Sequence, residues 1–137
     1  MHHWLLKTEP EEFSWADLVA AGARGETWNG VRNHQAAGFL RQMKRGDRAF
    51  IYHTGKERRL VGIGEISRAS YPDPSDAEGR FVAVTVRARD ALAKPVSLAS
   101  IKARPEFADF LLVRQSRLSV MPVTDEEWKL LLAMARA

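Results

Sequence analysis

The chain has 137 residues, a size typical of one folded domain, and 45% of them are hydrophobic and 28% charged, as in ordinary globular proteins. Its lack of cysteine excludes disulfides, thiol nucleophiles and cysteine-type zinc sites, and fits a reducing, cytoplasmic compartment. The formal net charge of +4 favours a polyanionic partner such as nucleic acid, whereas no apolar run is long enough to span a membrane and no signal peptide is expected.

The first half of the chain predicts strands around two helices. A short buried strand is expected over 3–7, and a helix over 14–22, where Ser14 and Asp17 have the spacing of a capping box. A second helix is expected over 33–47, with its apolar side chains at helical spacing and Gly46 as its end. Residues 47–69 then predict two strands joined by a charged turn at Gly55.

The second half predicts further strands and two more helices. Residues 71–80 are rich in Pro, Asp and Gly and indicate a loop, and 80–92 alternate as a half-buried strand does. A short helix is expected from Ser97, one or two strands over 111–123, and a last helix from Thr124, which with Glu127 matches a capping box. Five or six short strands among helices indicate an α+β fold with a strongly curved or closed sheet.

Trp28 is the sharpest candidate for a functional residue. It precedes the turn signal Asn29-Gly30 and stands outside any hydrophobic period, so it either plugs the core from a loop or forms one wall of a pocket for a flat ligand. Asn29 and Asn33 can hydrogen-bond a base edge, and Arg32 can meet a phosphate. Tyr71, in the predicted loop, is a second candidate wall, and stacking on such side chains contributes ~1–3 kcal/mol per base.

Other stretches leave alternatives open. Gly62 and Gly64 share one face of a predicted strand, where either tight curvature or a ligand close to the backbone requires glycine. Arg114 and Arg117 fall in an apolar strand pattern, where they need an internal acidic partner or a phosphate. The spacing of the histidines and the lack of cysteine favour neither a metal site nor a cofactor site.

Six short stretches over nearly the whole chain form a specific combination in a fixed order. They are WLLKTEP at 4–10, TWNGVRNHQA at 27–36, YHTG at 52–55, VGIGEI at 61–66, YPDP at 71–74 and LVRQSRLSV at 112–120. Together they resemble the EVE domain of the PUA-like superfamily. This chain departs from many family members in having Asn29 in place of Asp, which removes a charge, and His34 in place of Tyr.

The resemblance implies one EVE domain over 1–137, built as a small, strongly curved PUA-like β-barrel of five to six strands flanked by helices and related to YTH domains. It also implies a non-enzymatic reader of a modified base, either methylated or oxidised cytosine or N6-methyladenine, in DNA or RNA. Trp28 matches the cage tryptophan of YTH domains, and RQSRLSV resembles the strand that closes the pocket. We therefore expect a base pocket formed by Trp28, Asn29, Gly30, Asn33, Tyr71, Ser116 and Arg117. Phosphate contacts are expected from Lys7, Arg32 and Arg114.

Two other functions compete with the reader. Some PUA-like relatives are enzymes, and KTE at 7–9 resembles their arrangement, so a hydrolase of RNA or N-acylated nucleosides using Lys7 and Glu9 is the main alternative. A structural protein with an incidental basic surface is the third, and it would bind polyanions uniformly and only at low salt. The expected partner is a single-stranded or flipped modified base, bound by a monomer without metal, cofactor or membrane.

Overall fold

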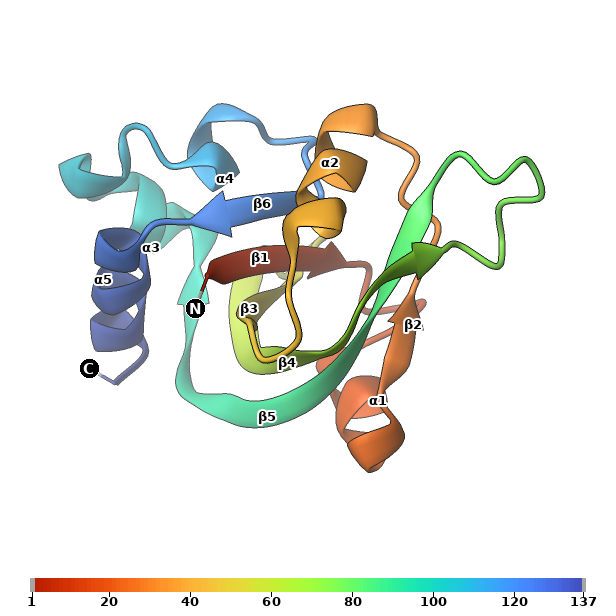
Figure 1. The fold of residues 1–137 in the computed structure, drawn as a ribbon. Coiled ribbons are helices and arrows are strands. Elements are labelled where there is room, and N and C mark those ends of the chain that lie inside the picture. The colour runs from red at the N-terminus through yellow and green to blue at the C-terminus, as the bar shows by residue number, and fades with distance from the viewer. Residues whose placement is uncertain (1, 137) are drawn as a thin grey trace.

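Six strands form one sheet in the computed structural model, which describes residues 2–136 (Figure 1). The strands are β1 (His3–Thr8), β2 (Glu26–Trp28), β3 (Arg48–His53), β4 (Arg59–Pro72), β5 (Val82–Ser97) and β6 (Val120–Val123). Their order is β2-β5-β4-β3-β1-β6; β1 and β3 run parallel and the other neighbours antiparallel. With the helices described below, this confirms the α+β prediction.

The sheet is strongly curved because its two longest strands bend together. β4 has 14 residues and β5 has 16, and their pairing shifts register at four places. Such shifts mark bulges or other irregularities of the pairing, and a bulge bends and twists a strand pair. Figure 1 shows the resulting ribbon sweeping around one side of the molecule, whereas the edge strands β2 and β6 are not paired with each other in the described part of the chain.

Two of the register shifts lie at Gly62 and Gly64, which settles the role of these glycines. A Cβ atom on Gly62 would lie 2.5 Å from the ring of Trp15, and one on Gly64 would lie 2.9 Å from Cγ1 of Val86. The protein's own side chains therefore fill the space beside this strand. The ligand-facing alternative is wrong here, and glycine is needed for close packing at a bend.

Five helices accompany the sheet: α1 (Trp15–Ala20), α2 (His34–Gln42), α3 (Leu98–Lys102), α4 (Leu111–Arg114) and α5 (Asp125–Arg136). Two 3₁₀ turns, η1 (Gly22–Arg24) and η2 (Pro105–Phe107), complete the order. The predicted capping box of Ser14 and Asp17 is confirmed, and so is that of Thr124 and Glu127, whose backbone and side chain bond reciprocally at 2.9 and 3.1 Å. No helix within residues 2–136 has the length and apolar character that crossing a membrane requires.

Three predictions of local structure are wrong. Residues 111–114 form α4 and 115–119 are neither helix nor strand, so the predicted strand is limited to 120–123. A short apolar run does not distinguish helix from strand. Helix α2 ends at Gln42, before Gly46. Tyr71 belongs to β4 and Trp28 ends β2, so neither lies in a loop.

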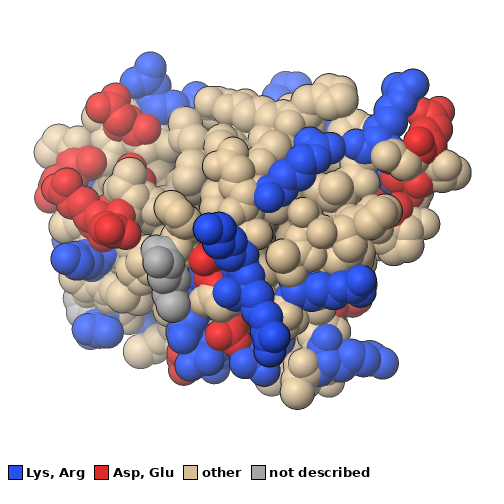
Figure 2. All heavy atoms as spheres, in the orientation of Figure 1, with Lys and Arg blue, Asp and Glu red and all other residues tan. Residues whose placement is uncertain are grey.

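Positive charge is unevenly spread over this framework. On the face drawn in Figure 2, Lys and Arg side chains gather over the lower part, where Figure 1 shows the β4–β5 ribbon. One carboxylate, Glu65, pairs there with Arg48, Arg87 and Arg89. A surface of this kind attracts polyanions without specifying which of them binds.

Candidate functional site

The end of β1, the loop that follows it and strand β2 enclose a hollow of about 380 Å³, named here the Trp28 hollow. Trp28 and Phe13 form an aromatic corner of it, with ring centroids 6.0 Å apart and ring planes at 86°. Its full lining is Lys7, Thr8, Glu9, Glu12, Phe13, Glu26, Thr27, Trp28 and Asn29.

Trp28 is both packed in the core and part of the lining of a hollow. It pairs with Val84 on β5 and is only 8% exposed, so most of its surface lies in the core. The same residue lines the Trp28 hollow. The rigid strand end thus presents part of an indole at the surface, which a loop would hold less firmly.

Phe13 is fixed beside Trp28 by hydrogen bonds that fold the loop after β1. The hydroxyl of Thr8 donates to the carbonyl oxygen of Phe13 at 2.6 Å, and the amide of Phe13 donates to the carbonyl oxygen of Glu9 at 2.9 Å. Both bonds join residues close in sequence, so the short connection to α1 forms locally. The aromatic corner is therefore organised before any ligand binds.

Carboxylates outnumber cations in the Trp28 hollow. Glu9, Glu12 and Glu26 line it, against the single ammonium group of Lys7. Glu9 is held by the Thr54 hydroxyl, which donates to its Oε2 at 3.0 Å. An acceptor-rich hollow with an aromatic corner suits a neutral, flat ligand that carries N–H donors, and it repels a phosphate.

Lys7 marks the border of this hollow. Its Nζ donates to the carbonyl oxygen of Ser116 at 2.8 Å and lies 5.6 Å from the centre of the Tyr52 ring. Burial removes water from the ammonium group and so lowers the pKa of Lys7. The predicted lysine therefore does lie beside Trp28, but with its head group turned toward Ser116.

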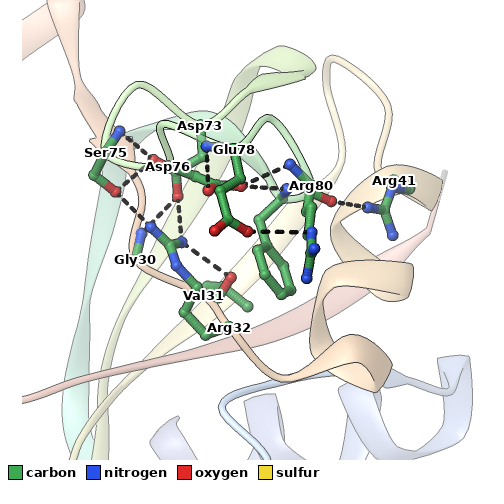
Figure 3. Close-up of polar contacts among 10 residues, drawn as sticks. Gly30, Val31, Arg32, Arg41, Asp73, Ser75, Asp76, Glu78 and Arg80 are labelled. Atoms are coloured by element: carbon green, nitrogen blue, oxygen red, sulfur yellow. Dashed lines mark hydrogen bonds and ion pairs between the residues drawn. The ribbon is translucent and has the colours of Figure 1, made fainter.

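The loop from Asn29 to Arg32 is tied down by a buried carboxylate (Figure 3). Oδ2 of Asp73 accepts from the Gly30 amide at 2.8 Å and from Nη1 of Arg32 at 3.0 Å, and its Oδ1 accepts from Ser75. Burial alone would raise the pKa of Asp73, but the bonds from Ser75, Gly30 and Arg32 outweigh it and lower this pKa to about 2. The Gly30 amide and Arg32, for which contacts with base and phosphate are predicted, both donate to Asp73 in this structure.

Tyr71 lies on the opposite face of the sheet from Trp28. Its hydroxyl is 2.7 Å from Oγ1 of Thr85 and 3.3 Å from Oγ1 of Thr27, and Thr27 precedes Trp28 on one strand. Successive side chains of a strand point to opposite faces, so Tyr71 and Trp28 are separated by the sheet. Tyr71 lines another hollow, together with Arg24 and Arg68, and the second aromatic wall beside Trp28 is Phe13.

The remaining predicted residues gather in a third place. Asn33, Arg114, Ser116 and Arg117 line a hollow of about 320 Å³, in which Arg114 pairs with Asp109 at 3.2 Å. Asn33 also caps α2, its Oδ1 accepting from the Ala36 amide at 2.9 Å. This hollow is separate from the Trp28 hollow, and the contact between Lys7 and the Ser116 carbonyl joins the two regions.

Sequence analysis missed Phe13, Glu12 and Glu26 as lining residues. A signal existed for Phe13, because an apolar residue directly before an N-cap such as Ser14 commonly fixes how the chain enters a helix. The glutamates carry no such signal, since surface glutamate is common. No group of three His, Asp or Glu side chains within residues 2–136 is placed to hold a metal ion.

Comparisons with known proteins agree on one family. The family model of the EVE domain matches residues 2–134. The human protein named thymocyte nuclear protein 1 is 32% identical over 96% of this chain and 73% of its own length. The NMR structure of Rpa0253 from Rhodopseudomonas palustris is 52% identical with a TM-score of 0.94, covering 99% of this chain and 94% of its own. The crystal structure of human THYN1 in complex with DNA containing 5-methylcytosine is 31% identical with a TM-score of 0.93, covering 100% and 99%.

Proposed function

This chain belongs to the EVE domain family, and we propose that it is a DNA-binding module that holds a modified cytosine, such as 5-methylcytosine, in the Trp28 hollow. The observation that carries the proposal is the pairing of an aromatic corner with carboxylate acceptors in one preformed hollow. The structure of the human relative with 5-methylcytosine DNA supports the choice of ligand.

The chemistry of the hollow matches a methylated cytosine. The indole of Trp28 and the ring of Phe13 offer apolar surface to the base and its 5-methyl group, and stacking of this kind contributes ~1–3 kcal/mol per base. The exocyclic amine of cytosine is a donor that carboxylates accept well, and Glu9, Glu12 and Glu26 supply such acceptors. Asn29 adds an amide that can donate and accept at the rim.

A base can enter only after it leaves the duplex stack. Flipping costs a few kcal/mol, so the site must lose little further entropy on binding. The bonds from Gly30 and Arg32 to Asp73 meet this need, because they hold the loop that carries Asn29 before the ligand arrives. Preorganisation, together with stacking, offsets the cost of flipping.

The hydrolase alternative has weaker support. Each side chain of KTE is engaged within the protein: Lys7 with the Ser116 carbonyl, Thr8 with the Phe13 carbonyl and Glu9 with the Thr54 hydroxyl. A general acid or base needs a polar atom directed at the substrate. Lys7 and Glu9 can still bind a ligand through their remaining hydrogen-bonding positions, but no contact in the described part of the chain pairs the two as an acid and a base.

The proposal is tested by titrating DNA that differs only in one central base. We expect the protein to bind 5-methylcytosine at least tenfold more tightly than cytosine at fixed moderate salt, in single strands and in duplexes. Phe13→Leu should reduce this preference severalfold, because it removes the ring beside Trp28. Trp28→Phe should do the same with less damage to the core than Trp28→Ala, which would open a cavity at a residue only 8% exposed.

The matched control is Phe39→Leu, which removes the same atoms from a helix face that packs against Trp4. It should leave the preference for 5-methylcytosine unchanged. Equal affinity of the unaltered protein for cytosine and 5-methylcytosine would contradict the proposal, and so would an equal loss of preference in Phe39→Leu and Phe13→Leu.

A further inference from the structure

A second hollow, of about 270 Å³, adjoins the Trp28 hollow and shares Lys7 with it. It is named here the Lys102 hollow. Its lining comes from β1, β3, the turn before β4 and helices α3 and α4: Lys7, Tyr52, Thr54, Gly55, Arg58, Leu98, Lys102, Leu112 and Ser116. Known pockets for drug-sized ligands range over roughly 300–1,000 Å³, so this one suits a smaller group.

The charge of the Lys102 hollow is opposite to that of the Trp28 hollow. Lys7, Arg58 and Lys102 line it, and no carboxylate does. None of the three forms an ion pair with an acidic side chain in the described part of the chain. Within residues 2–136, Lys7 and Arg58 donate only to carbonyl oxygens, so three cations without an acidic partner surround one small hollow and favour an anion there.

Tyr52 adds a neutral hydrogen-bond donor to the Lys102 hollow. The residue as a whole is 3% exposed and lines the Lys102 hollow, and its hydroxyl, which makes no hydrogen bond within residues 2–136, is not among the buried polar atoms that lack a partner there, so it remains accessible. Burial raises the pKa of Tyr52, so the hydroxyl stays protonated and keeps its donor. An accessible tyrosine hydroxyl can donate a hydrogen bond to an anion bound in the hollow.

Arg58 is held at the hollow in a conformation that side chains rarely adopt. Its φ is 46°, and it is the one non-glycine residue with positive φ in the described chain. Its Nε donates to the Gly55 carbonyl at 3.2 Å, and its own carbonyl accepts from the Leu98 amide at 2.8 Å. Backbone strain of this kind persists where the surroundings fix it, and it is concentrated at ligand sites.

We propose that the Lys102 hollow binds a backbone phosphate next to the base in the Trp28 hollow, through Lys7, Arg58, Lys102 and the Tyr52 hydroxyl. This inference rests on the proposed function. The carboxylates of the Trp28 hollow repel a phosphate, so the sugar–phosphate chain must leave across Lys7 toward the cations. Leu98 and Leu112 offer apolar surface to the deoxyribose.

The test neutralises phosphates one at a time. Short single-stranded DNA with one central 5-methylcytosine is prepared with a single uncharged methylphosphonate linkage at each position in turn. We expect the largest effect at one linkage beside the modified base. Neutralising that linkage should weaken binding at least fivefold. In Lys102→Gln the same neutralisation should reduce the affinity less than twofold, because the substitution has already removed the charged contact of Lys102 with this phosphate.

Two further variants sharpen the comparison. Tyr52→Phe removes only the hydroxyl and should weaken binding two- to fivefold with a charged linkage but not with the neutral one. Lys129→Gln makes the same change of charge on the exposed face of α5 and should retain the full effect of neutralisation. The same loss at every linkage in the unaltered protein, Lys102→Gln and Lys129→Gln would overturn the phosphate site.

The outcomes separate this site from the proposed function. Lys102 and a linkage are coupled if neutralising that linkage weakens binding less in Lys102→Gln than in the unaltered protein. A preference for 5-methylcytosine without such coupling at any linkage overturns the phosphate site alone. Coupling without any preference between cytosine and 5-methylcytosine supports the phosphate site and overturns the base reader. An absence of binding by all the oligonucleotides overturns both.

Discussion

Replacing Asp73 by Asn should destabilise the protein in a way that depends on pH. The carboxylate is fully buried and accepts from Gly30, Ser75 and Arg32, which lowers its pKa from 3.8 to about 2. Each unit of pKa corresponds to about 1.4 kcal/mol, so the ionised group contributes about 2 kcal/mol to the free energy of unfolding at neutral pH. We expect Asp73→Asn to lose about this amount.

The sign of the pH dependence follows from the lowered pKa. The folded state prefers the ionised carboxylate, so the contribution is complete above the unfolded pKa of about 4 and is lost as the pH falls toward 2. Urea unfolding of both proteins between pH 2 and pH 7 measures the difference directly. That difference should be about 2 kcal/mol at pH 6 and should shrink toward zero near pH 2.

A matched variant separates burial from ion pairing. Asp109 pairs with Arg114 at 3.2 Å, close to the 3.0 Å between Asp73 and Arg32, but its side chain is 97% exposed. Asp109→Asn should therefore change the free energy of unfolding by less than about 1 kcal/mol. A difference for Asp73→Asn that stays constant with pH, or one no larger than that of Asp109→Asn, would refute the assignment of Asp73 as the anchor of the loop.

Three further variants test the packing that positions the site, each by chemical denaturation. Gly62→Ala should destabilise the protein by roughly 1–3 kcal/mol, because its Cβ would meet the Trp15 ring at 2.5 Å; an unchanged midpoint would contradict this close packing. Gly38→Ala should stabilise it by about 0.5–1 kcal/mol, since Gly38 lies within α2 and a Cβ there meets nothing within 4 Å; a loss of stability would show an unrecognised contact. Thr124→Ala should cost about 1 kcal/mol through loss of the α5 cap, with Glu126→Ala, an exposed change in the first turn of that helix, as the comparison.

Local signals explain how much of the fold could be predicted. The caps at Ser14 and Thr124 involve residues three apart, so their bonds follow from the chain itself. The alternation of Val84 and Val86 along β5 likewise reflects one buried face. By contrast, α4 could not be distinguished from a strand, because four residues show no period.

The candidate site was harder to predict because its residues meet only through the tertiary fold. Trp28 stands out in the sequence and does line a hollow, but Phe13, the second aromatic residue there, comes from the loop after β1. Whether Tyr71 faces Trp28 depends on the register of β2 on β5, which no local pattern reveals. Arg32 and Asp73 are 41 residues apart in the sequence. The sequence alone therefore does not distinguish an arginine that binds a phosphate from one that pairs with a distant carboxylate.

The central claim is that a modified cytosine lies against Trp28 and Phe13, and the most direct test observes its methyl group. DNA carrying ¹³C-labelled 5-methylcytosine is titrated with the protein and followed by NMR. We expect the methyl signal to move upfield in the ring currents of the aromatic corner and to show contacts to protons of Trp28 and Phe13. A methyl signal that stays at its free position in the bound complex, or a methyl group that shows contacts to Tyr71 instead, would contradict the placement of the base in the Trp28 hollow.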